Sequence, residues 1–412
     1  MAKYIFEEHK DWWWWVTPKS LMDKPVHRWC VFPHSFTSEL VHALIDEWNL
    51  GCEDLILDPF AGAGTTILAA KEKGIPAKGY DLSPFAVLVT KAKIANLDVS
   101  RLEDAWEYLQ KSLDSMKWDG PTKDYPDLVH KALPGKLLSA FDALDRGISN
   151  LSVSEVERDF FRLALLTTIP LYSCAVATGG WLKWIKKRSR LSSIPSAFRR
   201  RVDLMLGDLH KVDLPRHPQW HVTQADARML PDNNGRYTAV ITSPPYPNRH
   251  DYTRVFGIEL MFGFLDWEET RHLRYQSFHS HPEAHPIRPE ICEYKQPLKL
   301  AKALAKIRNQ TKEPRIPNML AGYFLDMYIC LREIRRVCRS GARIASVVGN
   351  AQYYGESIPV DELTAEVGEQ VGLTCDKLLV TRYRGNSAQQ MGRYGRRPSR
   401  ESIVLFKRNQ IE

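Results

Sequence analysis

The sequence predicts an α/β fold in which a mostly parallel, doubly wound sheet ends in an antiparallel edge. Short apolar runs end in Gly, Pro, Asn or Asp, and helix-like segments follow the early ones. This alternation is typical of a parallel sheet. Two late runs, 377–381 and 402–407, are separated by a Gly- and Arg-rich loop. They predict a closing antiparallel hairpin.

Five strands are expected before that hairpin, at 54–58, 77–80, 220–224, 237–242 and 343–348. Helix-like patterns at 65–73 and 84–97 follow the first two strands. Two stretches do not fit the alternation, and we interpret both as insertions. The stretch 101–213 carries helical periodicity and no clear strand. The stretch 266–320 is rich in His, Pro and Lys, with little periodicity before 297–307.

These patterns predict six parts of the chain. They are an N-terminal arm (1–30), a first half of the core (31–100), a helical insertion (101–215), a second half of the core (216–265), a second insertion (266–320) and the remainder of the core with its hairpin (321–412).

The composition excludes several classes of protein. A charged fraction of 26% with 10% aromatic residues is not that of a disordered or collagen-like chain. No run of about 18 apolar residues exists, so no transmembrane helix is expected, and the N-terminus carries no signal-peptide pattern. The seven scattered cysteines contain no Cys-x-x-Cys and are typical of reduced thiols in a cytosolic protein. A net charge of +8 permits nucleic-acid binding without demonstrating it.

A glycine loop, Asp-Pro-Phe-Ala-Gly-Ala-Gly-Thr-Thr at 58–66, follows the first predicted strand and opens a helix. Small residues let backbone approach a ligand, and a helix N-terminus offers unpaired N–H groups. Ile67 stands where a dinucleotide fold needs its third glycine, and no lysine follows Gly64 as in a P-loop, so neither phosphate motif fits. Asp81 ends the next strand, where a carboxylate can accept both hydroxyls of a ribose. A tight turn with a solvent carboxylate would explain these residues as well.

A second motif, Thr-Ser-Pro-Pro-Tyr at 242–246, follows the strand at 237–242. Two prolines make the backbone rigid and remove two N–H donors, so the loop presents carbonyls only. These groups suit a planar aromatic amine. Ser243 and the Pro244 carbonyl can accept the two hydrogens of the amine, while Tyr246 stacks on the ring that carries it. The alternative is an ordinary proline-terminated strand.

Together the two motifs resemble those of the DNA amino-methyltransferases, which methylate an exocyclic amine of cytosine or adenine with S-adenosylmethionine. The segment 32–36 (Phe-Pro-His-Ser-Phe) is similar to the family's additional cofactor segment, and Asp226 matches the acid that binds the adenine amine. The resemblance covers about 30–97 and 220–408. It implies a class I methyltransferase fold, a Rossmann-like sheet of seven mostly parallel strands with an antiparallel terminal hairpin, plus the helical insertion.

The resemblance also implies roles for individual residues. It makes 31–100 the cofactor-binding half of the core, 216–265 its catalytic half and 266–320 the expected target-recognition insertion. Residues expected to bind S-adenosylmethionine are Phe32, His34, Ser35, Asp58, Pro59, Phe60, Ala61, Gly62, Gly64, Thr65, Thr66, Asp81, Leu82, Asp226 and Ala227. The expected catalytic residues are Ser243, Pro244, Pro245 and Tyr246.

The Ser form of the catalytic loop is more typical of the family's N4-cytosine enzymes, and the Asp form of its N6-adenine enzymes. We therefore expect methyl transfer to the N4 amine of a cytosine flipped out of a specific duplex sequence. C5 chemistry is excluded because no proline is followed by the cysteine nucleophile that it needs. The alternatives are an N6-adenine DNA methyltransferase, an RNA guanine-N2 methyltransferase and a catalytically dead DNA-binding protein of the same fold.

Basic residues in two regions are expected to contact DNA, because backbone phosphates need positive charge and Arg and Gln read base edges well. The alternative for the first region is a solvated helix face. The residues expected at DNA are Lys183, Lys186, Lys187, Arg188, Arg190, Arg384, Gln389, Gln390, Arg393 and Arg396. The second insertion carries further basic residues, among them Arg288, Lys295, Lys299, Lys302, Lys306, Arg308, Lys312 and Arg315.

Two further features carry no assigned role. The first is a group of possible metal ligands, His279, His281, His285 and Cys292, whose spacing is not that of a usual zinc site. We therefore interpret this segment as a solvated loop and expect no metal. The four tryptophans at 12–15 either stack on bases or line the cofactor pocket, or they cover an apolar face. The expected protein is a cytoplasmic monomer or dimer that acts on double-stranded DNA. A cognate restriction enzyme is an expected partner, and no association with a membrane is expected.

Overall fold

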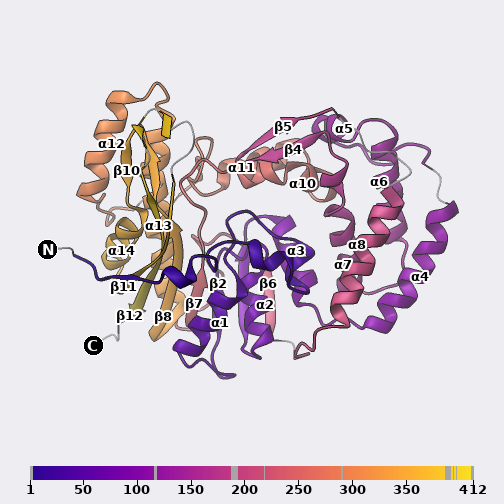
Figure 1. Cartoon of the computed structure of the whole chain (residues 1–412), viewed down its shortest axis with the longest axis horizontal. Coiled ribbons are helices and arrows are strands. Elements are labelled where there is room, and N and C mark those ends of the chain that lie inside the picture. The colour runs from indigo at the N-terminus through magenta and orange to yellow at the C-terminus, as the bar shows by residue number, and fades with distance from the viewer. Residues whose placement is uncertain are drawn as a thin grey trace.

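The computed structural model describes residues 3–115, 118–186, 194–217, 219–288, 291–385, 391–392, 394–395 and 397–409. An eight-stranded sheet with the order β1-β11-β12-β8-β7-β2-β3-β6 forms the centre of the molecule (Figure 1). Its strands are β1 (Phe6–Glu8), β2 (Ile56–Asp58), β3 (Ala77–Asp81), β6 (Trp220–Gln224), β7 (Tyr237–Thr242), β8 (Cys338–Gly349), β11 (Leu373–Arg384) and β12 (Ser399–Arg408).

All neighbouring strands in this sheet are parallel except at β12, which is antiparallel to both β8 and β11. This confirms the predicted α/β fold with its mostly parallel sheet and closing hairpin. The expectation of seven strands is wrong by one, because Phe6–Glu8 of the N-terminal arm pairs in parallel with β11. A long edge strand leaves N–H and C=O groups unpaired, and a short added strand pairs with them.

Two hydrophobic cores cover the two faces of the sheet. Along β7, Ala239 and Ile241 belong to one core, whereas Val240 between them belongs to the other. This alternation follows from the two-residue period of a strand, which sends successive side chains to opposite faces. Both faces are therefore buried, as a parallel sheet requires.

The helices of the core lie on these two faces. On the first face are α1 (Ser38–Glu47), α2 (Thr65–Glu72) and α3 (Pro84–Ile94). On the second face are α12 (Leu298–Gln310), α13 (Arg315–Val337) and α14 (Val360–Gln370). Short elements complete the core, namely β9 (Ala351–Tyr353), β10 (Glu356–Ile358) and the 3₁₀ helices η1 (Lys10–Trp12), η2 (Lys19–Met22) and η3 (His27–Trp29).

The helical insertion forms a lobe beside the sheet, in purple and pink at the right of Figure 1. Its elements are α4 (Val99–Ser115), α5 (Asp127–Ala132), α6 (Lys136–Ser149), α7 (Glu155–Leu166), η4 (Ile169–Leu171), β4 (Ala175–Thr178), β5 (Trp181–Trp184) and α8 (Ile194–Leu209). The expectation of no strand in 101–213 is wrong, because β4 and β5 form an antiparallel hairpin. Its turn is Gly179-Gly180, with Gly179 at a φ of 60°, a two-glycine turn that favours hairpins.

The segment after the catalytic loop is also more regular than the sequence predicts. It contains α9 (Tyr252–Val255), α10 (Gly257–Gly263) and α11 (Trp267–Gln276), and α13 begins before residue 320. Only Thr270 of α11 is buried, so apolar periodicity could not reveal this helix. The capping box formed by Asp266 and Glu269 was the available signal. Among the described residues, we find no helix with the length and apolar character that crossing a bilayer needs.

Candidate active site

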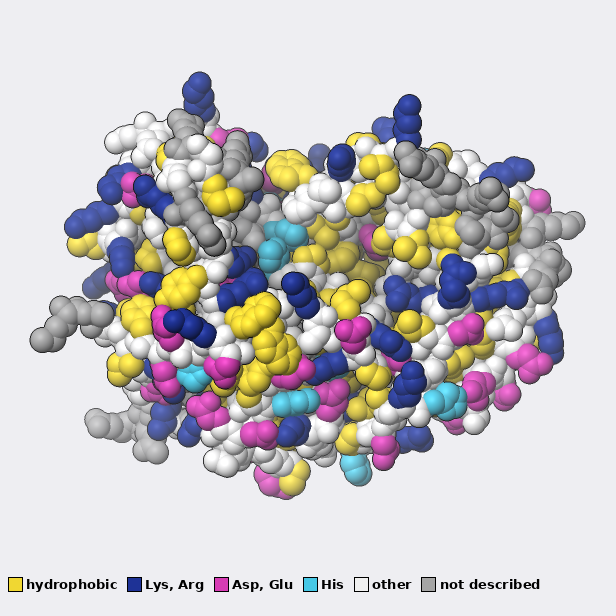
Figure 2. All heavy atoms as spheres, viewed as in Figure 1, with side chains coloured by type: hydrophobic (Ala, Val, Ile, Leu, Met, Phe, Trp, Pro, Cys, Tyr) yellow, Lys and Arg dark blue, Asp and Glu magenta, His cyan; other side chains and the backbone are white. Residues whose placement is uncertain are grey.

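The two sequence motifs leave the sheet at the same edge. β2 ends at Asp58 and β7 ends at Thr242, and these two strands are parallel neighbours with Leu57 opposite Val240. An open cavity lies at this edge and is lined by both loops. Figure 2 shows this face hollowed between the two lobes, with hydrophobic side chains on the walls and Lys and Arg on the rims.

Most of the residues predicted to bind cofactor or substrate line this one cavity. They are Phe32, His34, Ser35, Asp58, Pro59, Phe60, Ala61, Gly62, Thr65, Asp81, Leu82, Asp226, Ala227, Ser243, Pro244, Pro245 and Tyr246. Gly64 and Thr66 are not among its lining residues. Sequence reasoning missed the lining residues from α9, α10 and the following segment, which include Tyr252, Phe256, Leu260, Ser277 and Phe278.

The glycine loop depends on two glycines with left-handed backbone. Gly62 has a φ of 51° and Gly64 a φ of 78°. A Cβ at Gly64 would lie 2.8 Å from Oγ1 of Thr90, so both the conformation and the close approach require glycine. Gly64 therefore shapes the turn and packs it on α3, while Gly62 stands at the cavity.

Buried polar side chains tie the glycine loop to β7. Oδ1 of Asp58 accepts hydrogen bonds from the Phe60 N–H at 3.1 Å and from Oγ1 of Thr242 at 2.6 Å. The hydroxyl of Thr66 donates to the Ile241 carbonyl at 3.1 Å. Burial raises the pKa of Asp58 to about 6. The two loops are thus held to each other by side chains of the motif itself.

Asp81 lies at the end of β3, beside the glycine loop. Its carboxylate accepts the N–H groups of Gly62 and Ser83, each at 2.9 Å, and burial raises its pKa above the ordinary value. A carboxylate has about four lone-pair sites, so these two bonds leave acceptors for the hydroxyls of a ribose. The predicted ribose role of Asp81 stays a prediction.

The Ser-Pro-Pro-Tyr loop packs on β8 and β11. Oγ of Ser243 donates to the Val347 carbonyl at 3.3 Å, and Tyr246 is buried. A Cβ at Gly349 would lie 2.9 Å from Cε2 of Tyr246, so only glycine lets the ring lie against the strand. The guanidinium of Arg384 is 5.9 Å from the centre of that ring. The ring is consequently held from behind while the loop faces the cavity.

The segment 32–36 forms another wall of the cavity. The ring of Phe32 lies 4.3 Å from that of Phe256, centre to centre, and the hydroxyl of Tyr252 donates to the Pro33 carbonyl at 3.2 Å. Burial lowers the pKa of His34 to about 4, so its imidazole is neutral near pH 7. The buried Lys93 donates to the Cys30 carbonyl at 2.6 Å and to the Ala63 carbonyl at 2.8 Å. Lys93 thereby joins the backbone just before this segment to the glycine loop, a role that no sequence signal indicated.

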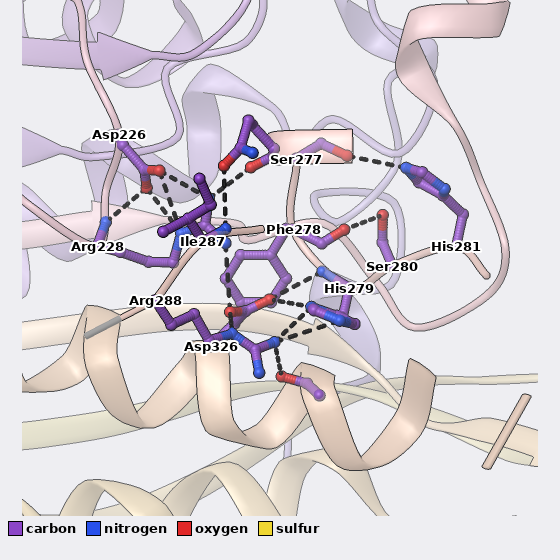
Figure 3. Close-up of polar contacts among 12 residues, drawn as sticks. Asp226, Arg228, Ser277, Phe278, His279, Ser280, His281, Ile287, Arg288 and Asp326 are labelled. Carbon is purple, nitrogen blue, oxygen red and sulfur yellow. Dashed lines mark hydrogen bonds and ion pairs between the residues drawn. The ribbon is translucent and has the colours of Figure 1, made fainter. Parts of the chain in front are cut away.

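A network of charged side chains holds the segment after α11 against α13 (Figure 3). Asp226 pairs with Arg228 at 2.7 Å, and Arg228 reaches the buried Asp326 of α13 at 3.3 Å. Arg288 and His279 also bind Asp326, each at 2.8 Å. Ser277 and Phe278 line the cavity, so this network fixes one of its walls and orients Asp226.

The solvated-loop interpretation holds for the exposed His285 and Cys292 and is wrong for His279 and His281. His281 is buried, and its Nε2 lies 2.8 Å from Oγ of Ser277. His279 binds Asp326, and His285 packs on Tyr275 with ring centres 4.2 Å apart. Among the residues that the structure describes, no three His, Cys, Asp or Glu side chains are grouped as metal ligands.

The residues predicted to contact DNA divide into two groups. Lys183 and Lys186 are exposed at the β4–β5 hairpin, and Arg384 lies beside Tyr246. The others, Lys187, Arg188, Arg190, Gln389, Gln390, Arg393 and Arg396, lie outside the described residues.

Several basic residues of the second insertion are engaged within the protein. Arg288 pairs with Asp326, and ion pairs also join Lys299 to Glu362, Lys306 to Glu356 and Arg315 to Glu313. These ion pairs make this insertion a weaker candidate for phosphate contacts than its composition suggested.

The four tryptophans at 12–15 do not line the cavity. Trp12 and Trp15 pack against the first core with ring centres 4.6 Å apart, which agrees with the apolar-cover interpretation. Trp13 is 48% exposed and borders a shallow hollow formed with 381–385.

Comparisons with known proteins agree with this geometry. A family model described as a DNA methylase matches residues 5–92. The chain is 27% identical to type II methyltransferase M.BsoBI of Geobacillus stearothermophilus, covering 95% of this chain and 87% of that protein. It is also 27% identical to type II methyltransferase M.AvaI of Nostoc sp., covering 93% and 87%. A solved geranyl diphosphate C-methyltransferase from Streptomyces coelicolor A3(2) has 9% identity and a TM-score of 0.34, with 99% of this chain and 89% of that one covered.

The parallel sheet, the paired strand-end loops and these relatives define a methyltransferase that acts on DNA. The family model and these relatives support a DNA amino-methyltransferase, whose methyl donor is S-adenosylmethionine.

Proposed function

We propose that the protein transfers a methyl group from S-adenosylmethionine to the N4 amine of a cytosine that is flipped out of duplex DNA. The observation that carries the proposal is the shared cavity between the glycine loop and the Ser-Pro-Pro-Tyr loop. Ser243 rather than Asp at the head of that loop favours cytosine over adenine. The relatives are named type II methyltransferases, which supports a role in restriction–modification.

The residues present fit S-adenosylmethionine. The carboxylate of Asp81 keeps free acceptors for ribose hydroxyls, Gly62 brings backbone close to the ligand, and Phe32 and Phe60 offer apolar surfaces. The Asp226 carboxylate, which Arg228 orients, would accept a hydrogen from the adenine amine. When bound, the donor supplies a methyl group on a positively charged sulfur.

The Ser-Pro-Pro-Tyr loop would prepare the target nitrogen. The lone pair of an aromatic amine is delocalised into the ring, so the amine is a poor nucleophile. Acceptance of its two hydrogens by Oγ of Ser243 and the Pro244 carbonyl favours a pyramidal nitrogen whose lone pair faces the methyl group. The N–C bond forms as the S–C bond breaks, and the nitrogen then releases one proton to solvent. Positioning of this kind contributes several kcal/mol.

Tyr246 would offset part of the cost of extrusion. Removing a base from the stack costs a few kcal/mol. Stacking on an aromatic side chain is worth about 1–3 kcal/mol per base, and the buried ring of Tyr246 is already held in place by Gly349 and Arg384.

Sequencing the DNA of a methylation-free host that expresses the protein tests this function. We expect N4-methylcytosine in one sequence context, read by single-molecule kinetics, and a much lower methylated fraction with Ser243→Ala. Finding N6-methyladenine alone would contradict the choice of base while keeping the mechanism. Unmodified DNA from the wild-type strain would contradict the function itself.

A further inference from the structure

The hairpin of the helical insertion docks beside the catalytic loop. A Cβ at Gly180, in the hairpin turn, would lie 2.5 Å from the Arg249 carbonyl oxygen and 3.1 Å from the His250 Cα. Only glycine permits this approach, so the turn is seated on the backbone that follows Tyr246. In Figure 1 the same hairpin extends from the helical lobe over the middle of the molecule.

Trp181 stands next to this contact and is held in place on one side. The guanidinium of Arg254 lies 4.6 Å from the centre of the Trp181 ring. Arg254 is itself paired with Asp251 at 3.2 Å and with Glu283 at 3.3 Å. The ring nevertheless stays 55% exposed, so its free surface is open to a stacking partner.

The register of the hairpin directs Trp181 away from the core of its own lobe. Leu182 packs against the first core, so the neighbouring positions 181 and 183 point to the other face of the ribbon. Lys183 is exposed on that same face. Tyr252 and Thr253, which precede Arg254, line the catalytic cavity. An aromatic ring and a cation therefore stand together at the cavity rim.

We infer that Trp181 enters duplex DNA beside the extruded nucleotide and stacks on the base pair that borders the gap. The inference rests on the proposed function, since a gap exists only when a base is flipped. An exposed ring with an adjacent cation matches the chemistry of DNA, which offers π faces inside and phosphates outside. The partner is the duplex itself, whereas the flipped base belongs to Tyr246.

Two duplexes with the sequence context found by sequencing test this role. One has the target base paired, and the other has it mispaired, which removes most of the cost of extrusion. With Trp181→Ala we expect methylation of the paired duplex to slow about tenfold and that of the mispaired duplex to change less than twofold. Affinity for S-adenosylmethionine should not change, and Trp181→Phe should keep most of the activity.

Trp184→Ala is the matched control. Trp184 lies on the same strand and is 48% exposed, but it points to the opposite face of the ribbon, so both duplexes should be methylated at the wild-type rate. Equal losses with Trp181→Ala on paired and mispaired DNA, or no loss on either, would overturn the inference. A wild-type protein that methylates neither duplex would instead overturn the proposed function.

Discussion

The two loops of the active site reach rigidity in opposite ways. The glycine loop uses residues without side chains, with Gly62 and Gly64 in left-handed backbone, and Gly62 donates its N–H to Asp81. The Ser-Pro-Pro-Tyr loop uses two prolines, which restrict φ and leave no N–H to donate. One loop is therefore suited to close backbone contact with a ligand, and the other to accepting hydrogens from an amine.

The support of the two loops differs as well. The glycine loop is held by neighbours from its own half of the core, since Thr90 packs on Gly64 and Lys93 binds the Ala63 carbonyl. Tyr246 is held by strands from the C-terminal part of the chain, through Gly349 and Arg384. This difference implies that donor binding and methyl transfer can be damaged separately.

The largest separate effect is expected from Ser243→Ala. It removes one acceptor of the target amine but no group that holds the donor, so turnover should fall on the order of 100-fold. Calorimetry should show wild-type affinity for S-adenosylmethionine, and exposed Ser357→Ala is the control. Full turnover by Ser243→Ala would contradict the different roles of the two loops, because the Ser-Pro-Pro-Tyr loop would then not contact the amine.

Gly64→Ala is expected to weaken binding of S-adenosylmethionine, which Ser243→Ala leaves unchanged. A Cβ there meets Thr90 at 2.8 Å with φ at 78°, so the loop must shift and affinity for the donor should drop about tenfold. Gly207→Ala in α8 is the control, because nothing lies within 4 Å of a Cβ there. Titration calorimetry checks both. Unchanged donor binding by Gly64→Ala would show that the turn does not set the cofactor site.

Asp58 joins the two loops, so substitutions at Asp58 should change donor affinity and turnover together. Asp58→Ala leaves the Phe60 N–H and the Thr242 hydroxyl without an acceptor and should lower donor affinity and turnover several-fold each. Asp58→Asn should keep most of both, because one amide oxygen can accept both bonds. Equal losses in the two variants would mean that the charge matters and the hydrogen bonds do not.

The smallest effect on activity is expected from Glu259→Gln in α10, a buried residue that does not line the cavity. Burial raises the pKa of Glu259 from 4.5 to about 7. Between pH 4.5 and about 7 the Glu259 carboxyl is therefore protonated in the folded state but ionised in the unfolded state. The free energy of unfolding falls by roughly 3 kcal/mol as the pH rises through this range.

Glu259→Gln removes that loss. At pH 8 its melting temperature should exceed that of the wild type, and at pH 4.5 the two should nearly agree, while turnover at pH 8 stays the same. Thermal unfolding followed by circular dichroism measures this difference. Parallel curves across the whole pH range would contradict the buried, protonated state of Glu259.

The parts of the active site that consist of short sequence motifs were predictable from the sequence. Asp58 and Ser243 each follow an apolar strand, and the carboxyl ends of parallel strands meet at one edge. The sheet and its terminal hairpin were predictable for the same reason, because the period of the strands is local. Neither conclusion needed knowledge of distant contacts.

The remaining features depend on contacts between distant parts of the chain. Lys93 joins two segments only after α3 has packed, and the Asp326 network needs three separate segments to converge. The short strand β1 exists because β11 presents a free edge. The polar helix α11 lacks the apolar stripe that would reveal it.

A crystal structure with S-adenosyl-L-homocysteine tests the central claim most directly. We expect the ligand between the glycine loop and the segment 32–36, with its ribose at Asp81 and its sulfur facing Ser243. A ligand bound at another edge of the sheet, or with its sulfur turned away from the Ser-Pro-Pro-Tyr loop, would contradict the claim that both loops serve one reaction.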